Sequence, residues 1–524
     1  MTDNPEQDWP PFLYGLKATK PFGHPVTEFR VLETHISWVL LTGSFAYKFK
    51  KPVDLGFVDF SKLEKRKHFC EEELRLNRRF TEGLYLGLVT LTGSPESPEW
   101  NGTGKPFEYG VKMTQFPQEH LLSHLVERDG LTREHIDNLA DEVARFHQQI
   151  EVAPADSSFG IPRKIMEPIE ENFSQIGSSF QDDSTIRFWL EMVHRWSREE
   201  HSRLEETFIE RKKRGFIREC HGDMHLGNML LWKNKVALFD CIEFNEQFRW
   251  IDVMSEITFC VMDLFKRDEE ALARRFLNRY LERTGDYAGM AVFSYYFVYR
   301  AMVRAKVDAI RLRQTGLTES EQKEVRNECL GYVDLAQRFS ERLEPTLYIT
   351  HGFSGSGKTY GTEPMVDEVG AIRVRSDVER KRLFGLAPEE RPNSSTTREL
   401  YSEDSTNRTY ERLAEVTESL LTDGFMVVVD ATFLERTRRD QFRALADRLQ
   451  VPFHIFDFKV PVEVLRERVR KRFQQQSDAS DANLDVLEHQ LRTAKPLAPD
   501  ERDVTLTVTG DDMNVVEIRK TAKH

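Results

Sequence analysis

The chain has 524 residues, of which 39% are hydrophobic and 31% are charged, and its formal net charge is -13. This length exceeds what one hydrophobic core usually serves, so it predicts two or three domains. The acidic balance excludes a general nucleic-acid-coating protein, because such binding depends on Lys and Arg neutralising phosphates.

The N-terminal residues, the apolar runs and the cysteines indicate where the protein is located. Residues 1–11 are acidic and contain no apolar stretch of the kind that a secretory signal needs. Apolar runs such as Ala291 to Tyr299 are far shorter than the roughly 18 residues that cross a bilayer. The cysteines are odd in number, lie far apart and form no CxxC pair: Cys70, Cys220, Cys241, Cys260 and Cys329. We therefore expect a cytoplasmic protein with reduced thiols and no membrane partner.

The first part of the chain predicts two lobes. Residues from about 12 to 116 are rich in predicted strands with one helix, and residues from about 117 to 343 are mainly helical. Two predicted strands, Ile36 to Leu41 and Ala46 to Lys51, flank a short turn whose single glycine is Gly43. This pattern predicts a hairpin turn over a nucleotide.

The second of these strands carries two lysines. Because side chains alternate along a strand, Lys48 and Lys50 share one face, and one of them would pair the phosphates of ATP. A carboxylate that orients this lysine would come from the helix predicted for Leu63 to Phe80, at Glu71, Glu72 or Glu73. The alternative is that the lysines mark a solvated edge strand.

A catalytic-loop pattern follows in the helical lobe. His221-Gly222-Asp223-Met224-His225-Leu226-Gly227-Asn228 fits HxDxxxxN, and an apolar strand then ends at Asp240. In this pattern the aspartate accepts the proton of the acceptor hydroxyl and the asparagine ligates the metal. We predict Asp223 as the base and Asn228 and Asp240 as magnesium ligands. The alternative is that Asp223 and Asn228 only cap turns, and both histidines are expected to form hydrogen bonds rather than hold a metal.

A boundary is predicted near residue 344. Apolar positions recur at helical spacing from about Glu321 to Leu343, and Pro345 follows before a short apolar strand. The chain thus divides into residues 1–343 and 344–524. The linker is short, so we expect the two parts to meet in a packed or hinged interface.

The second part opens with a phosphate-binding loop. Residues 352–359, Gly-Phe-Ser-Gly-Ser-Gly-Lys-Thr, fit GxxxxGK[ST]. Backbone N–H groups of such a loop wrap a phosphate, its lysine reaches the outer oxygens, and its hydroxyl holds Mg²⁺. The predicted nucleotide ligands are Gly352, Ser354, Gly355, Ser356, Gly357, Lys358 and Thr359, with Thr359 also on the metal.

The rest of this part predicts a parallel sheet of about five strands covered by helices. The expected strands are Thr346 to Thr350, Ala371 to Val374, Phe425 to Val429, Phe453 to Phe458 and Val504 to Val508. Ligands of such sheets lie beyond the carboxyl ends of the strands, where Asp377 and Asp430 follow. Asp377 would deprotonate an acceptor hydroxyl, Arg380 would steady a phosphate, and Asp430 would hold the metal's water shell or the acceptor.

Arginines at positions 466, 468, 470 and 472 fall on one predicted helix. Arg468 and Arg472 share a face at i, i+4 spacing, which suits a lid whose arginines meet the transferring phosphoryl group. The alternative is a solvated face that pairs with Glu463 and Glu467.

The HGDxHxxN loop and Asp240 resemble the aminoglycoside phosphotransferase and choline kinase branch of the protein-kinase-like superfamily. The resemblance implies that Val111 to Phe116 hold adenine and that Asp252 steadies the catalytic loop. The second part resembles P-loop kinases of the zeta-toxin, gluconate kinase and polynucleotide kinase type, through Asp377, Arg380 and Asp430. The order of parts is similar to that of bacterial fusion proteins that join these two domains.

Together these features predict an α+β protein-kinase-like two-lobe domain followed by an α/β P-loop domain. The expected function is a tandem kinase that uses ATP and Mg²⁺ to phosphorylate hydroxyl acceptors, either small molecules or nucleotides. One alternative is that only the C-terminal half is active, as a polynucleotide 5′-hydroxyl kinase. Another is an ATP-operated switch that binds a partner protein. The sequence leaves the acceptors and the oligomeric state open.

Overall fold

The structure is a computed structural model that describes residues 2–3, 9–56, 58–313, 317–341, 344–390, 396, 399–475 and 482–508. Contacts group the chain into two compact units. The first unit comprises Met1–Leu139, Gln149–Lys164 and Arg211–Cys260, and the second comprises Ala140–Gln148, Ile165–Glu210 and Val261–His524. This grouping places helices that precede residue 343 together with the P-loop region, and the division at residues 343 and 344 stays a prediction.

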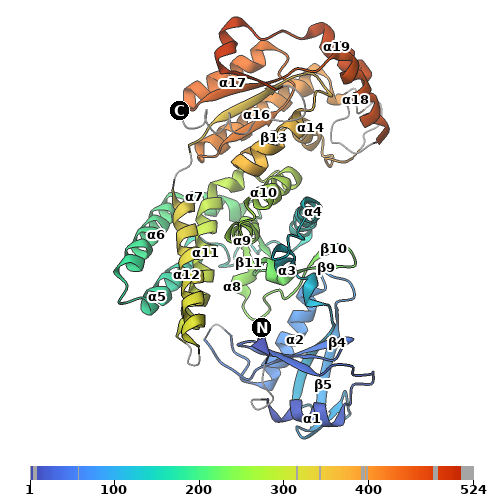
Figure 1. Ribbon diagram of the computed structural model, residues 1–524, viewed down its shortest axis with the longest axis vertical. Coiled ribbons are helices and arrows are strands. Elements are labelled where there is room, and N and C mark those ends of the chain that lie inside the picture. Colours follow the sequence, from blue (N-terminus) through green and yellow to red (C-terminus); the bar gives the residue numbers. More distant parts are fainter. Residues whose placement is uncertain are drawn as a thin grey trace. The chain divides into compact units, whose positions relative to one another are not determined.

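The first unit contains an antiparallel sheet, drawn in blue in Figure 1, whose strand order is β1-β2-β3-β4-β7-β5-β6. Its strands are β1 (Thr2–Asp3), β2 (Arg30–Glu33), β3 (Ser37–Leu41), β4 (Phe45–Lys50), β5 (Tyr85–Ser94), β6 (Ser97–Trp100) and β7 (Glu108–Thr114). Helix α1 (Pro11–Thr19) begins with a proline at its first position, where no N–H is needed. Leu16 of α1 lies in the same buried cluster as Leu40, whereas Leu74 of α2 (Leu63–Asn77) lies in the same buried cluster as Val39. Neighbouring β3 residues face opposite sides, so the two helices cover opposite faces.

The rest of the first unit builds the loop region. Its elements are η2 (Gln118–His120), α3 (Leu122–Val126), β8 (Ile217–Glu219), η3 (Leu226–Asn228), β9 (Met229–Trp232), β10 (Lys235–Leu238), α8 (Glu246–Arg249) and β11 (Trp250–Asp252). β8 pairs with β11, and β9 forms a hairpin with β10. The predicted catalytic loop therefore runs from β8 to β9, and Asp240 follows β10.

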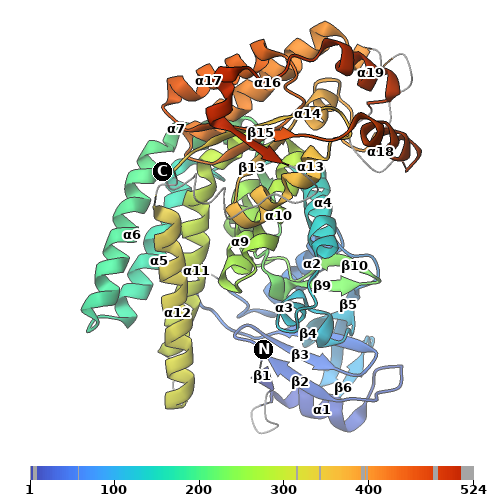
Figure 2. The ribbon, with the colours of Figure 1, turned by 45° about the horizontal axis from the view of Figure 1, so that its top comes forward.

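Further helices lie before and after these elements in the chain. They are α4 (Arg133–Gln149), α5 (Pro162–Ser179), α6 (Ser184–Arg203), α7 (Glu205–Lys213), α9 (Val253–Lys266), α10 (Glu270–Thr284), η4 (Tyr287–Val292), α11 (Phe293–Leu312) and α12 (Glu319–Ser340). Within the second unit α6, α11 and α12 lie side by side (Figures 1 and 2). α12 starts at a capping box in which Thr318 and Glu321 bond each other's backbone N–H groups, and it corresponds to the helix predicted from Glu321.

The expected five-stranded parallel sheet is confirmed, with strand order β13-β14-β12-β15-β16. Its strands are β12 (Leu347–His351), β13 (Ile372–Arg375), β14 (Val427–Asp430), β15 (Phe453–Phe458) and β16 (Thr505–Val508). The accompanying helices are α13 (Lys358–Gly361), η5 (Met365–Val369), α14 (Ser376–Leu383), α16 (Glu403–Thr422), α17 (Arg436–Leu449), α18 (Val462–Gln475), α19 (Leu484–Thr493) and η6 (Pro499–Val504). Tyr348, Val428 and Phe456 pack together in the core of this sheet.

Two further findings concern the cysteines and membrane-spanning helices. All five cysteines are buried and none forms a disulfide. Across the part of the chain that the structure describes, we find no helix that is both long enough and apolar enough to cross a membrane.

Candidate active sites

The two lysines of β4 point to one buried glutamate. Lys48 Nζ lies 2.9 Å from Glu73 Oε1, and Lys50 Nζ lies 2.7 Å from Glu73 Oε2. Both lysines are buried and β4 lies between β3 and β7, so the solvated-edge alternative is wrong. Glu71 and Glu72 instead form pairs with neighbours on their own helix, at Lys67 and Arg75.

The two lysines differ in their second partner. Lys48 also contacts Asp240, whereas Lys50 contacts Glu243. Burial disfavours the charged form of Lys48, but Asp240 and Glu73 outweigh burial and raise its pKa well above the ordinary value. Burial likewise opposes ionisation of Glu73, yet the two lysines lower its pKa to about 2. Lys48 is thus the lysine beside a predicted metal ligand, and Lys50 is held by carboxylates in the interior.

The catalytic loop brings Asp223 and Asn228 together. Asn228 Nδ2 donates to the backbone oxygen of Asp223 at 3.0 Å and to its Oδ2 at 2.9 Å. This leaves the amide oxygen of Asn228 as the atom that would hold a metal. The Asp223 side chain is 35% exposed, so an acceptor hydroxyl can approach it from solvent. Its role as the base stays a prediction.

Asp240 is held in an uncommon backbone conformation beside this loop. Its φ is 61°, in the left-handed region that aspartate adopts at some functional sites. The N–H of Asp240 donates to the hydroxyl of Tyr85 at 3.0 Å, and the N–H of the preceding Phe239 donates to the carbonyl of Asn228 at 3.0 Å. The two predicted metal ligands therefore lie on adjacent, hydrogen-bonded segments.

The residue that steadies the loop is not the predicted one. The N–H groups of His221 and Gly222 donate to Glu256 at 2.6 and 3.0 Å. The implied residue, Asp252, instead accepts from Arg211 at 2.7 and 2.8 Å and from the N–H of Met254. Glu256 is fully buried in the first turn of α9, and a carboxylate among the apolar residues of this turn was the signal that could have indicated it.

His221 is a hydrogen-bonded core residue, as expected. Its Nε2 donates to the carbonyl of Phe239 at 2.8 Å, and its Nδ1 accepts from the N–H of Asp223 at 3.3 Å. Burial lowers its pKa to about 4, so the ring is neutral. In His225 the ring Nδ1 accepts from the N–H of Gly227 at 3.1 Å.

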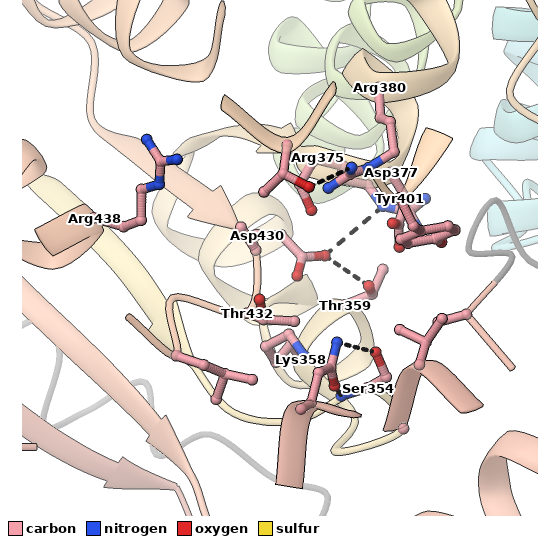
Figure 3. A pocket seen from close by; sticks show the side chains of 18 of the residues that line it. Ser354, Lys358, Thr359, Arg375, Asp377, Arg380, Tyr401, Asp430, Thr432 and Arg438 are labelled. Carbon is pink, nitrogen blue, oxygen red and sulfur yellow. Dashed lines mark hydrogen bonds and ion pairs between the residues drawn. The ribbon is translucent and has the colours of Figure 1, made fainter. Parts of the chain in front are cut away.

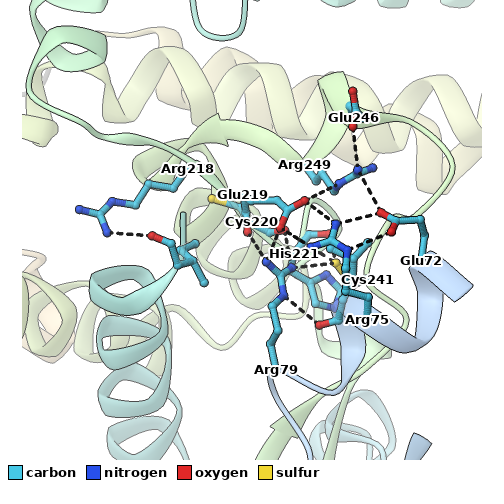
Figure 4. Close-up of polar contacts among 12 residues, drawn as sticks. Glu72, Arg75, Arg79, Arg218, Glu219, Cys220, His221, Cys241, Glu246 and Arg249 are labelled. Atoms are coloured by element: carbon cyan, nitrogen blue, oxygen red, sulfur yellow. Dashed lines mark hydrogen bonds and ion pairs between the residues drawn. The ribbon is translucent and has the colours of Figure 1, made fainter. Parts of the chain in front are cut away.

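An ion-pair network ties α2 to the start of the catalytic loop (Figure 4). Glu219 lies 2.7 Å from Arg75, 3.0 Å from Arg79 and 3.2 Å from Arg249. Glu219 ends β8 and precedes His221 by two positions, while Arg75 follows Glu73 on α2. The lysine-binding helix and the catalytic loop are consequently positioned together.

Hydrogen bonds within the protein hold the turn that is predicted to cover the nucleotide. The N–H groups of Thr42 and Gly43 both donate to Gln115 Oε1, at 3.0 and 2.9 Å. The φ of Gly43 is 96°, and a Cβ there would lie 1.9 Å from Thr27 Oγ1. These two N–H groups therefore have a protein acceptor, and the N–H of Thr42 also donates to the carbonyl of Phe45 at 2.9 Å.

In the second unit the glycine-rich loop has the shape of an anion cradle. Gly355 and Gly357 have φ values of 84° and 87°, a backbone conformation that L side chains rarely adopt and that anion-binding loops use. Lys358 Nζ donates to the carbonyl oxygens of Gly352 and Phe353 at 3.0 and 2.8 Å. Ser356 Oγ is buried and has no hydrogen-bond partner among the described residues. This donor set fits a phosphate.

The metal and acceptor residues line one cavity of about 1090 Å³ beside this loop (Figure 3). Thr359 Oγ1 donates to Asp430 Oδ2 at 2.6 Å, a hydroxyl and carboxylate pair of the kind that holds Mg²⁺. Asp377 and Arg380, from α14, also line the cavity. Arg380 donates to the carbonyl of Leu400 at 2.7 Å.

Two family models match the chain. One, described as "Phosphotransferase enzyme family", matches residues 103–293, and the other, described as "AAA domain", matches residues 347–497. The chain is a kinase-type phosphotransferase enzyme. We call residues 103–293 the phosphotransferase segment and residues 347–497 the P-loop kinase segment.

The chain is similar to proteins from mycobacteria and to solved structures of kinases. Uncharacterized proteins of Mycobacterium bovis and Mycobacterium tuberculosis are each 29% identical over 467 residues, which cover 87% of this chain and 89% of theirs. A gluconokinase from Sinorhizobium meliloti is 23% identical over 34% of this chain and 91% of its own, with a TM-score of 0.24. An ethanolamine kinase from Plasmodium vivax is 9% identical over 61% and 85%, with a TM-score of 0.38. Because both scores are below 0.5, the fold assignment depends on the family models and the strand order.

The predicted lid of the P-loop kinase segment is only partly as expected. Arg468 lines the cavity. Arg466 lies 2.7 Å from Glu488 of α19, and the hydrogen bond to Glu488 and its charge, with a smaller contribution from Glu463, raise the pKa of this arginine. The side chain of Arg472 lies outside the described residues.

No sequence pattern indicated Gln490, which makes a second contact from α19. Its Oε1 accepts from the N–H of Ser354 at 3.0 Å, and its Nε2 donates to Ser354 Oγ at 3.1 Å. α19 is therefore bonded directly to the phosphate-binding loop. Such a contact depends on tertiary packing, and a glutamine on an amphipathic helix carries no local signal for it.

Proposed function

We propose that the enzyme transfers the γ-phosphoryl group of ATP to hydroxyl acceptors at two centres, each with Mg²⁺. The observation that carries this proposal is the cavity of the P-loop kinase segment, which Lys358, Thr359, Asp377, Arg380 and Asp430 line together. Mg²⁺ would neutralise the charge that develops on the phosphates and orient them for in-line transfer.

At the first centre Lys48, oriented by Glu73, would hold the phosphates of ATP. Asp223 would take the proton of the acceptor hydroxyl while that oxygen bonds to the γ-phosphorus and the bond to the bridging oxygen of ADP breaks. The metal would be held by Asn228 and Asp240. The nearby pairs of Lys48 with Glu73 and Asp240 support this assignment.

At the second centre the loop N–H groups and Lys358 would bind the phosphates, and Thr359 and Asp430 would hold the metal. Asp377 would accept the proton of the hydroxyl, and Arg380 and Arg468 would stabilise the phosphoryl group in transfer. The 2.6 Å bond between Thr359 and Asp430 supports the assignment of the metal site.

The test compares wild type with Asp223→Ala and Lys358→Ala. Each is incubated with labelled ATP, Mg²⁺ and a cell extract that contains metabolites and RNA, and the labelled products are identified. Matched controls are Asp182→Ala and Lys471→Ala, whose side chains are exposed. We expect each active-site variant to lose a different product and the controls to lose none.

Other outcomes distinguish the alternatives. If Lys358→Ala abolishes all labelling, the label lies on RNA 5′ ends and Asp223→Ala has no effect, only the P-loop kinase segment is active. If ATP binds tightly but no hydroxyl compound is labelled by wild type, the enzyme proposal fails and a nucleotide-operated switch takes its place.

A further inference from the structure

An edge strand of the P-loop sheet is covered by a helix of the phosphotransferase segment. β13 lies at the edge of the sheet, and α10 supplies Asn278, which is buried. The N–H of Arg373 donates to Asn278 Oδ1 at 2.8 Å, and Asn278 Nδ2 donates to the carbonyl of Ala371 at 3.2 Å. An amide side chain thus satisfies the outward backbone groups that an edge strand leaves unpaired. All these residues belong to the second unit.

The same helix places a carboxylate among the arginines of β13. Glu282 is buried, with one oxygen 3.3 Å from Arg373 Nη2 and the other 3.6 Å from Arg375 Nη1. Burial alone would raise the pKa of Glu282, but Arg373 and Arg375 lower it, so this side chain is anionic.

The two arginines continue to the predicted metal site. Arg373 Nη1 donates to the carbonyl of Thr359 at 2.9 Å. Arg375 Nε lies 3.7 Å from Asp430 Oδ2, the same oxygen that accepts from Thr359 Oγ1. Arg375 therefore lies between two carboxylates, Glu282 and Asp430, and Figure 3 shows it beside Asp430.

We propose that Glu282 is a positioning residue for the metal site of the P-loop kinase segment. A guanidinium and a divalent cation compete for one carboxylate. Glu282 offers Arg375 a second anionic partner, so Asp430 stays available to the metal. The inference depends on the proposed function of the second centre. It means that the phosphotransferase segment contributes a residue to the P-loop centre.

The test measures metal binding directly on the full chain. The parent carries Asp240→Asn, which removes a predicted ligand of the other centre. Free Mn²⁺ is titrated by electron paramagnetic resonance in the presence of ADP, for the parent and for Glu282→Gln, Glu282→Asp and Thr359→Ala. The matched control is Glu270→Gln, on the same helix, which loses pairs with Arg274 and Arg338 instead. Thermal unfolding without metal is recorded for each.

We expect Glu282→Gln to raise the Kd for Mn²⁺ about tenfold, as befits a unit charge lost near the site. Glu282→Asp should raise it less, Glu270→Gln should leave it unchanged, and Thr359→Ala should abolish binding. If Glu282→Gln lowers the unfolding temperature but leaves the Kd unchanged, Glu282 is only structural and the inference is overturned. If the parent binds no Mn²⁺ with ADP, the inference falls together with the proposed function of this centre.

Discussion

In the first unit, the contacts of Lys48 and Lys50 predict different roles for the two lysines. Lys48 and Lys50 share Glu73, but only Lys48 contacts Asp240. Lys50 is fully buried between Glu73 and Glu243. A buried carboxylate without a partner is far more costly than an exposed one. We therefore predict that Lys48 contacts the nucleotide and that Lys50 stabilises the lobe.

Replacing Lys50 should destabilise the protein strongly. Lys50→Met leaves two buried carboxylates with one lysine, which should cost about 3–5 kcal/mol. The control Lys65→Met removes a surface pair with Asp59 and should cost much less. Urea unfolding followed by tryptophan fluorescence measures both. The double variant Lys50→Met/Glu243→Leu should recover part of the loss. Equal losses in the two single variants would contradict the assignment.

At the scale of elements, a turn and a helix each carry a constraint that sequence position alone does not reveal. The turn between β3 and β4 is closed by Gln115, which follows β7. Helix α11 carries Asp308, which is buried and whose Oδ2 has no hydrogen-bond partner among the described residues. In both cases residues distant in the sequence, and not the local sequence, determine how the turn or the aspartate behaves.

Gly43→Ala should disturb the nucleotide turn. A Cβ at this position meets Thr27 Oγ1 at 1.9 Å and the φ of 96° disfavours any L side chain. We expect the KM for ATP at the first centre to rise several-fold, with a loss of about 1–2 kcal/mol in stability. The control is Gly56→Ala, whose φ is 81° but whose Cβ meets nothing within 4 Å. If both variants change the KM equally, the turn has no special role.

Asp308 should make the stability of the helical region depend on pH. Burial raises its pKa from the ordinary 3.8 to about 6, despite Arg304 nearby. The folded state therefore favours the protonated acid. The free energy of unfolding has its full value, as far as Asp308 is concerned, below about pH 4, and it falls as the pH rises through about 6. Asp308→Asn should raise stability at pH 8 by about 1–3 kcal/mol and have little effect near pH 4.

Thermal unfolding at both pH values measures this difference. The control Asp334→Asn replaces an exposed carboxylate on α12 and should change stability at neither pH. A gain for Asp308→Asn that is the same at pH 4 and pH 8 would show that its carboxyl does not titrate in this range.

At the scale of the whole molecule, the two segments are connected through shared packing inside the second unit. α10 belongs to the phosphotransferase segment, yet Arg274 donates to the carbonyl of Glu368 at 2.8 Å and Asn278 covers β13. These contacts lie within the second unit, and the packed or hinged interface between residues 1–343 and 344–524 stays a prediction. It follows that the P-loop kinase segment and its neighbouring helices should respond together when ligand binds.

Mg²⁺ with ATP should stabilise the enzyme against heat. A ligand that binds only the folded state at about 100 times its Kd adds about 2.7 kcal/mol. Addition of a chelator in excess should reverse the increase in unfolding temperature. Lys358→Ala should remove the part of the increase that belongs to the second centre, whereas Lys471→Ala should keep all of it. An increase that persists with chelator would mean that ATP binds without a metal.

Short sequence patterns determined the two loops and the strands of the P-loop sheet. The phosphate-binding loop, the catalytic loop and the five parallel strands follow from residues close together in the sequence, because local spacing and hydrophobic pattern specify them. Tertiary structure alone decided that Glu73 is the partner of the lysines, that Glu256 rather than Asp252 holds the catalytic loop, and that Glu282 reaches Arg375. These contacts join residues far apart in the chain, and only the packing of separate elements brings their charges within a few ångström.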